Sequence, residues 1–210
     1  DPVSLAVRGR TVLIAGEPGT GKSWLAGLLC EQLILQGYCL CVIDPEGDYG
    51  PLEALPGVVV FGRDERPPRL SEVGRGFRYP DISVVIDLSQ STHEEKVNYL
   101  KDLLPMVAAL RRDTGQPHWI VVDEAHYFLN RSDFRRHVDI ELAGYVLVTY
   151  RVSDLPPDLL KQVESIILTQ ITNPHEMHVL TTSYGRSGEQ SQAEQLLRGL
   201  ATDEAVFVPQ

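Results

Sequence analysis

The segment from Gly16 to Ser23 reads GEPGTGKS and matches the spacing G-x-x-x-x-G-K-S. An apolar run from Thr11 to Ala15 precedes it and an amphipathic stretch, residues 24–29, follows it, so we expect it to join a strand to a helix. Its glycines allow backbone N–H groups to point at phosphate oxygens, and the helix adds the positive end of its dipole. The pattern therefore predicts a site for a nucleoside triphosphate.

Each polar residue of this loop has an expected role. Lys22 is expected to reach the β- and γ-phosphates, and the Ser23 hydroxyl is expected to bind Mg²⁺. We expect the Trp24 side chain to pack in the core rather than on a base, because the apolar face of its helix should cover the sheet. The predicted nucleotide-binding residues of this segment are Gly16, Glu17, Pro18, Gly19, Thr20, Gly21, Lys22, Ser23 and Trp24.

A second set of chemical residues follows the apolar run Trp119–Val122, where the sequence continues with Asp123 and Glu124. An acidic residue at the end of such a strand can hold Mg²⁺ through water, opposite the phosphate loop. A second carboxylate beside it can orient and deprotonate an attacking water. We therefore expect Asp123 on the metal and Glu124 as the catalytic base of a hydrolysis.

The elements that must position these residues alternate between strands and helices along the chain, which predicts an α/β fold with a mostly parallel sheet flanked by helices. A helix is expected over residues 93–112, capped by Ser91 or Thr92. Ligands of such sheets bind at the carboxyl ends of the strands, where Asp44, Asp123 and Tyr150 fall. The expected strands are 11–15, 39–43, 58–61, 84–88, 119–122, 145–149, 165–171 and 205–208.

Composition limits the classes of function. The chain has 210 residues and a net charge of −10, which argues against gripping nucleic acid by bulk electrostatics. An arginine-rich stretch, residues 63–78, is either a local basic patch or a solvated loop. No run approaches a membrane span. Cys30, Cys39 and Cys41 lack metal-ligand spacing and indicate reduced core thiols of a cytoplasmic protein.

Four segments together resemble the HerA and FtsK group of P-loop ATPases, most closely the HerA-like central ATPase domain. They are the phosphate loop, VIDPEGDY at 42–49, DEAHYFL at 123–129 and VLVTYRVSDLP at 146–156. The resemblance implies a RecA-like fold of the ASCE type over residues 1–210, as one domain that is either excised from a larger motor or a minimal version of it. It also places Asp44 near the γ-phosphate.

The function implied by the resemblance is Mg²⁺-dependent ATP hydrolysis that drives a DNA translocase or helicase. Members of the group are typically hexameric rings that act on double-stranded DNA, often beside a nuclease or another effector. A homo-hexamer with these partners, and without a membrane, is therefore the expected assembly.

Two departures from the family pattern concern catalysis. Tyr150 stands where the family has a glutamine that senses the γ-phosphate, and a phenol cannot match the paired donor and acceptor of an amide. Asp139 stands where the family tends to carry an arginine that reaches a neighbouring subunit. Arg135 or Arg136 could replace it, and we take Arg136 as the candidate. An arginine of this kind is worth about 10³- to 10⁵-fold in rate.

Two other functions stay open. A small P-loop kinase has a comparable length and an arginine-rich lid, although Glu124 argues against it because a kinase must keep water from attacking. A nucleotide-gated switch or partner-binding module with slow hydrolysis is consistent with Tyr150 and Asp139. His126 is expected to make a structural hydrogen bond, and His175 and His178 are expected at the surface.

Overall fold

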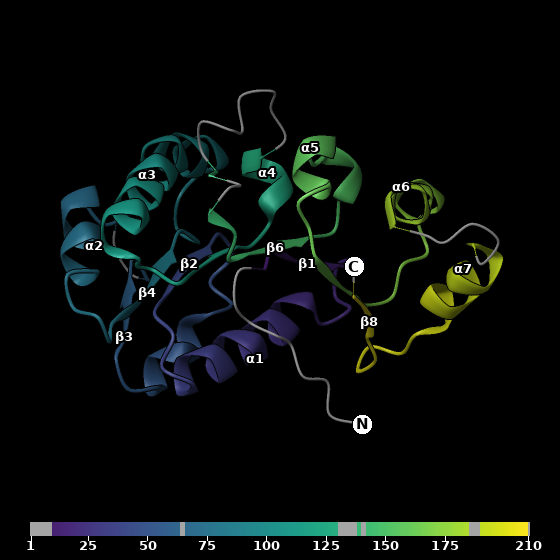
Figure 1. Ribbon diagram of the computed structural model, residues 1–210, viewed down its shortest axis with the longest axis horizontal. Coiled ribbons are helices and arrows are strands. Elements are labelled where there is room, and N and C mark those ends of the chain that lie inside the picture. The colour runs from purple at the N-terminus through teal and green to yellow at the C-terminus, as the bar shows by residue number, and fades with distance from the viewer. Residues whose placement is uncertain (1–9, 64–65, 130–137, 140–141, 185–189, 210) are drawn as a thin grey trace.

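A single sheet with eight strands organises the molecule, in the order β3-β4-β2-β5-β6-β1-β7-β8 (Figure 1). This computed structural model describes residues 10–63, 66–129, 138–139, 142–184 and 190–209. The strands are β1 Val12–Ala15, β2 Leu40–Asp44, β3 Val58–Phe61, β4 Ser83–Asp87, β5 Trp119–Val122, β6 Tyr145–Thr149, β7 Ser165–Leu168 and β8 Val206–Pro209. Every strand expected from the sequence is present, and the mostly parallel α/β fold is confirmed.

Most neighbouring strands run parallel, and β8 alone of these strands pairs antiparallel, with β7. The strand that leads into the phosphate loop, β1, lies between β6 and β7, with Ala15 opposite both Thr149 and Leu168. On the other half of the sheet, β5 lies between β2 and β6. The carboxyl ends of β1, β2, β5 and β6 therefore meet at one edge of the sheet, as the sequence predicted.

Helices connect these strands and cover both faces of the sheet (Figure 1). The α-helices are α1 Lys22–Leu35, α2 Leu70–Gly76, α3 His93–Thr114, α4 Ala125–Leu129, α5 Pro157–Leu160, α6 Pro174–Tyr184 and α7 Gln190–Gly199, and the short 3-10 helices are η1 Gly50–Ala54 and η4 Val152–Asp154. The capping prediction for α3 is confirmed at Thr92, whose hydroxyl accepts the Glu95 N–H.

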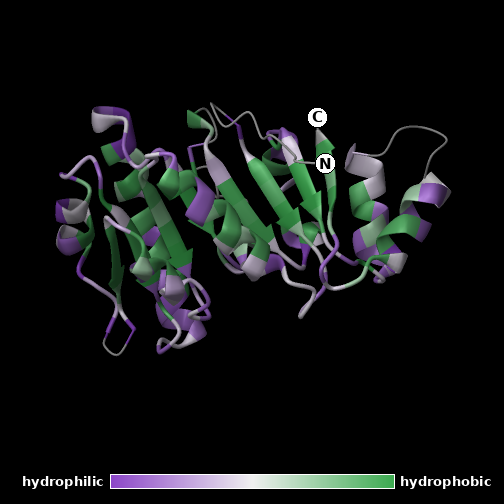
Figure 2. Ribbon diagram, turned by 90° about the horizontal axis from the view of Figure 1, so that it is seen from below, coloured by the Kyte–Doolittle hydropathy of each residue, from purple (hydrophilic) through white to green (hydrophobic). Residues whose placement is uncertain are grey.

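Alternate residues of each strand enter different cores, because successive side chains of a strand point to opposite faces. Val12 and Ile14 of β1 pack with α1 and η1 on one face, whereas Leu13 and Ala15 pack in the larger core under α2, α3, α4 and α5. The strands are accordingly hydrophobic throughout, while the outer helix faces are hydrophilic (Figure 2).

Trp24 corrects one expectation. Its side chain is 70% exposed, so the prediction that it packs in the core is wrong. The buried positions of α1 are Lys22, Ala26, Cys30 and Leu33. A residue two positions before Ala26 points roughly 200° away around the helix, at about 100° per residue, and so faces away from the sheet. The apolar face of α1 does cover the sheet, but Trp24 does not lie on that face.

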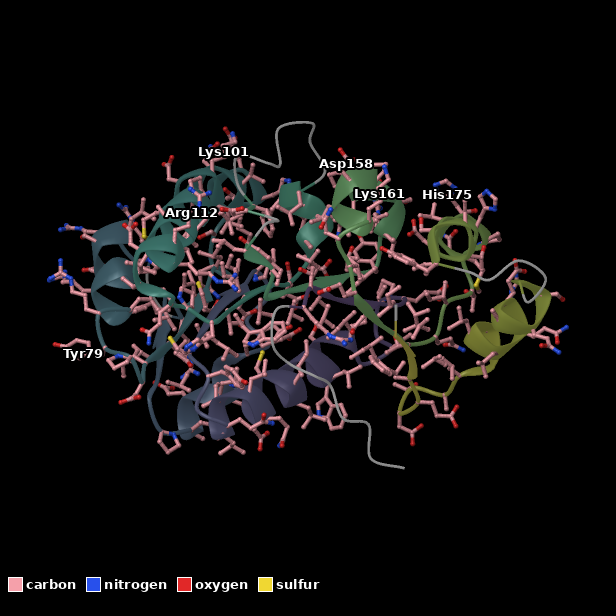
Figure 3. All side chains as sticks on the ribbon, viewed as in Figure 1. Tyr79, Lys101, Arg112, Asp158, Lys161 and His175 are labelled. Atoms are coloured by element: carbon pink, nitrogen blue, oxygen red, sulfur yellow. The ribbon has the colours of Figure 1, made fainter. Side chains whose placement is uncertain are left out.

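The cysteines and the exposed histidine His175 lie where the sequence predicted them. Cys30, Cys39 and Cys41 are free and buried, as predicted for core thiols. His175 is exposed and lies at the periphery, as do Lys101 and Asp158 (Figure 3). Within the part of the chain that the structure describes, no cluster of three metal-ligand side chains exists, and no helix has the length and apolar character to cross a membrane.

Candidate nucleotide-binding site

The phosphate loop lies between β1 and α1 and depends on its glycines. Gly19 and Gly21 have φ values of 76° and 89°, in the left-handed region that favours glycine. A Cβ atom at Gly16 would lie 1.8 Å from the Thr169 Oγ1, so the start of the loop passes directly against the residue that follows β7. The loop geometry therefore requires glycine for two reasons, backbone conformation and close approach.

Lys22 is buried at the base of this loop, with 6% of its surface exposed. Its Nζ donates a hydrogen bond to the Glu17 carbonyl oxygen at 2.8 Å. Burial lowers the pKa of Lys22, whereas the charges of Glu124 and Asp123 raise it. The ammonium group thus lies close enough to both carboxylates for their fields to act on it.

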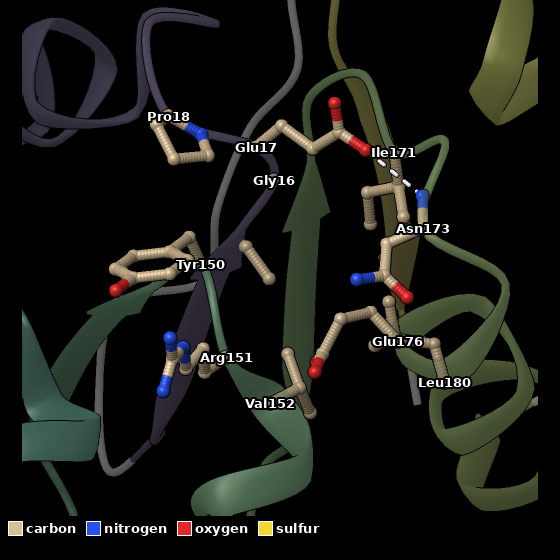
Figure 4. A pocket seen from close by; sticks show the side chains of 11 residues that line it. Gly16, Glu17, Pro18, Tyr150, Arg151, Val152, Ile171, Asn173, Glu176 and Leu180 are labelled. Carbon is tan, nitrogen blue, oxygen red and sulfur yellow. Dashed lines mark hydrogen bonds between the residues drawn. The ribbon is translucent and has the colours of Figure 1, made fainter.

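Glu17 fastens the loop to the segment between β7 and α6. Its Oε1 accepts hydrogen bonds from the Thr172 N–H at 2.6 Å and the Thr172 hydroxyl at 2.5 Å. The same oxygen accepts the Asn173 N–H at 2.8 Å (Figure 4). The hydroxyl contact of Thr172 holds the pKa of Glu17 below its usual value. A second contact joins the loop to the end of β7, a 2.6 Å hydrogen bond between the hydroxyls of Thr20 and Thr169. Sequence reasoning named Glu17 and Thr20 but missed their distant partners.

Asp123, at the end of β5, is a buried carboxylate with 2% of its surface exposed. Its Oδ1 accepts the Glu124 N–H at 2.8 Å. Burial is the main reason that its pKa is raised to about 7, and the charges of Glu124, Asp44 and Asp48 act in the same direction. A buried carboxylate with other acids nearby fits a divalent cation, which prefers hard oxygen ligands.

A cavity of about 440 Å³ opens beside the loop, and its walls include Ser23 and Asp48. Ser23, one of the two residues expected to bind Mg²⁺, lines this cavity, whereas Asp123, the other, does not. The full lining is Gly19, Gly21, Lys22, Ser23, Trp24 and Asp48, which are mostly residues predicted to bind the nucleotide.

Glu124 directly follows Asp123 and has an unusual backbone, with φ of 48°. Non-glycine residues in this region are uncommon and cluster at functional sites. Its side chain is 19% exposed, and its Oε2 lies 3.3 Å from the Nδ1 of His126. Burial raises the pKa of Glu124, and the charge of Lys22 lowers it. A partly buried carboxylate with a raised pKa is suited to take a proton from water.

Asp44 organises the turn after β2. It is fully buried, and its carboxylate accepts backbone N–H bonds from Gly47 at 2.7 Å, Asp48 at 3.0 Å and Tyr49 at 2.9 Å. Burial nevertheless raises its pKa. The turn it stabilises carries Asp48 to the wall of the cavity, a residue that sequence reasoning did not select.

Tyr150 follows β6 and lies on the opposite flank of the loop, in a cavity of about 280 Å³ that it shares with Gly16, Glu17 and Pro18 (Figure 4). Its ring meets the His126 ring edge-on, with 4.6 Å between centroids. The Arg151 guanidinium lies 5.2 Å from the centroid of the Tyr150 ring. Tyr150 is thus placed between the start of the phosphate loop and His126.

With this geometry in place, the chain can be compared with known families. The model of the HerA helicase central domain matches residues 2–143, which is more than half of the sequence. The chain belongs to this family. Its P-loop, acidic turn and Asp123-Glu124 pair are all found within the matched range.

Solved structures show the same fold at low sequence identity. The genome packaging NTPase B204 of Sulfolobus turreted icosahedral virus 2, in complex with ATP-gammaS, is 18% identical, with a TM-score of 0.67 over 96% of this chain and 92% of that one. VirB4 of Thermoanaerobacter pseudethanolicus is 14% identical, with a TM-score of 0.67 over 99% of this chain and 89% of that one. Among curated proteins, none matches the sequence.

The arginine expected to act across a subunit boundary cannot be placed. Arg135 and Arg136 lie outside the described residues, as does the segment 185–189. Asp139 is described, and it forms an ion pair with Arg112 of α3, whose Nε donates to its Oδ2 at 2.6 Å. At the position where the HerA-like sequences tend to carry an arginine, this chain therefore has an acid that pairs within its own subunit.

Proposed function

We propose that this chain is a Mg²⁺-dependent ATP hydrolase and the motor domain of a HerA-like DNA translocase. The observation that carries the proposal is the convergence of Lys22, Asp123 and Glu124 beside a glycine loop built for phosphates. Lys22 lies within the electrostatic reach of both acids. One cation, a metal-side carboxylate and a partly buried base are the groups that hydrolysis of a phosphoanhydride requires.

In this mechanism Lys22 exchanges the Glu17 carbonyl for oxygens of the β- and γ-phosphates, where its charge stabilises the transition state. Glu124 orients a water and accepts its proton as the water oxygen bonds to the γ-phosphorus. The bond between the γ-phosphorus and the β-γ bridging oxygen breaks in the same step, and ADP leaves with that oxygen. Ser23 and Asp123 would hold Mg²⁺, which when bound supplies positive charge to the phosphate oxygens. The backbone N–H groups of the loop fix the phosphates in place.

The first test is steady-state ATP hydrolysis by Lys22→Ala and Glu124→Gln, with nucleotide affinity measured by calorimetry. Lys22→Ala should weaken ATP binding and abolish turnover, because the ammonium group that contacts the loop backbone is removed. Glu124→Gln should keep ATP affinity and reduce turnover by about 10²- to 10⁴-fold, the usual contribution of a general base. Parent-like turnover by Glu124→Gln would show that the base is assigned wrongly.

Double-stranded DNA is the proposed substrate of the motor, and a hexameric ring is the proposed assembly, with an effector or nuclease subunit as a further partner. Support comes from membership of the HerA central-domain family and from the likeness to a protein described as the DNA-packaging ATPase of Sulfolobus turreted icosahedral virus, which is 19% identical with a TM-score of 0.65 over 97% of this chain and 93% of that one. We propose that residues 1–210 form one such motor domain. Its net charge of −10 requires the DNA contact to be local.

A nucleotide-gated switch is the second candidate, favoured by Tyr150 in place of a glutamine and by the ion pair of Asp139 with Arg112. Both features remove groups that would accelerate hydrolysis in a ring. A switch would bind ATP tightly and turn it over slowly, without a response to DNA.

A further inference from the structure

His126 is a buried polar residue that the proposed ATPase mechanism does not use. It lies in the first turn of α4 and is 2% exposed. Its Nδ1 lies 3.0 Å from the Thr149 Oγ1 and 3.3 Å from the Glu124 Oε2. One ring nitrogen thus faces the last residue of β6 on one side and the proposed catalytic base on the other.

The protonation state of the ring follows from its surroundings. Burial is the main cause, with the nearby Arg151 charge, of a His126 pKa lowered to about 4, so the ring is neutral at pH 7 and has a single N–H. An ionised carboxylate oxygen can only accept, whereas the Thr149 hydroxyl, which accepts the Arg151 N–H at 2.9 Å, can still either donate to Nδ1 or accept from it. The contact with Glu124 is attractive only when the ring proton is on Nδ1.

On the Glu124 side, the contact with His126 is made by Oε2. Its Oε2 is buried and has no hydrogen bond to the residues that the structure describes, although Nδ1 is its neighbour at 3.3 Å. Catalytic hydrogen bonds are often long before substrate binds and shorten in the reactive complex. A carboxylate in this state is close to its donor but not yet fixed by it.

The ring itself is held firmly. The Tyr150 ring meets it edge-on at 4.6 Å and the Tyr127 ring lies tilted at 4.2 Å, measured between centroids. Thr149 limits rotation through its contact with Nδ1. The direction of the N–H is therefore set by β6 and by the residue that follows it.

We infer that His126 is a positioning residue for Glu124, which orients the carboxylate through Nδ1 and couples it to the end of β6 at Thr149 and Tyr150. The inference rests on the proposed role of Glu124 as the base. Tyr150 also borders the start of the phosphate loop, so His126 links the wall of the nucleotide site to the group that activates water.

The test compares His126→Phe, which keeps an aromatic ring without a nitrogen, with His126→Asn, whose amide N–H can occupy the place of Nδ1–H. His126→Phe should lower kcat by about 10²-fold, the usual result of misplacing a catalytic group by an ångström, with KM and ATP affinity within twofold of the parent. His126→Asn should recover most of the lost kcat. A purely structural histidine predicts no such rescue.

Thr149 provides an independent pair of variants that does not depend on the folding of His126→Phe. Thr149→Ser keeps the hydroxyl and should match the parent in kcat. Thr149→Val removes the hydroxyl at nearly constant shape and should lower kcat without changing ATP affinity. Equal kcat values for these two variants would overturn the coupling to β6.

A double-mutant cycle separates action through Glu124 from any other effect. In single-turnover reactions with excess enzyme, His126→Phe should slow the parent but have little effect in a Glu124→Gln background. A full effect in that background, or a His126→Phe kcat within twofold of the parent, would overturn the inference. If the parent binds ATP but never hydrolyses it, the proposed function fails instead, and the two failures are thereby distinguished.

Discussion

The Asp123 carboxylate is buried, so its negative charge destabilises the folded protein when no cation is bound. Its folded-state pKa of about 7 is above the ordinary value of 3.8. A raised carboxyl pKa means that the protonated form stabilises the fold, and this contribution is lost as the pH rises through 7. The metal-free protein should thus be less stable at pH 8 than at pH 5.

Asp123→Asn isolates this effect, because the amide keeps an acceptor for the Glu124 N–H but carries no charge. With EDTA present, its free energy of unfolding should exceed that of the parent at pH 8 by up to about 4 kcal/mol, the equivalent of the pKa difference. The gap should close near pH 4, where both side chains are neutral. Urea unfolding at the two pH values measures it, and a variant less stable than the parent at pH 8 would contradict the prediction.

Residue-level interpretation located the phosphate loop between β1 and α1 and the acidic pair at the end of β5, but it missed the contacts between distant residues. The loop GEPGTGKS and the Asp123-Glu124 pair could be predicted because each is contiguous in sequence. Thr172 and Asn173 could not, since they are 155 and 156 positions from the Glu17 carboxylate that they bind. Trp24 was assigned to the core because the apolar face of its helix should cover the sheet, although the phase of α1 turns it outward.

At the scale of elements, the contact between the phosphate loop and β7 determines which substitutions the loop can accept. A Cβ atom at Gly16 would lie 1.8 Å from Thr169 Oγ1 and 3.0 Å from Thr169 Cβ. Gly16→Ala should lower the free energy of unfolding by about 1–3 kcal/mol, the usual cost of overpacking, and should weaken ATP binding. Adding Thr169→Ala should restore part of the loss because it removes the nearer atom.

Gly27→Ala is the matched control, since a Cβ atom there meets nothing within 4 Å and the residue lies inside α1. It should raise stability by about 0.5–1 kcal/mol, the helix preference of alanine over glycine. Thermal or urea unfolding measures all of these variants. The prediction fails if Gly16→Ala is as stable as Gly27→Ala.

The strands were predictable because doubly buried parallel strands are continuous apolar runs, as in residues 40–43 or 145–148. Their order was not, since pairing joins segments far apart in the chain. The antiparallel direction of β8 could not be predicted either, because its four residues are as apolar as those of a parallel strand.

At the scale of the whole molecule, a motor and a switch differ in how turnover depends on neighbours. If a ring completes each site, ATP hydrolysis per subunit should rise steeply with protein concentration as light scattering detects assembly, and should rise again with double-stranded DNA. Flat, slow turnover by a monomer that ignores DNA would favour the switch. Removing charge from the arginine-rich stretch, residues 63–78, should reduce the DNA response if the local patch makes the contact.

The position of β1 in the sheet determines when, during synthesis, the phosphate loop can reach its folded surroundings. Its two neighbours, β6 and β7, come from residues 145–168, beyond the segment 2–143 that defines the family match. A chain emerging during synthesis presents the glycine loop early, yet the strand that carries it has no sheet partner until β6 appears. The ability to hold nucleotide should therefore arise late in translation, and a polypeptide stopped at residue 143 should be a poor binder although it contains every residue of the loop.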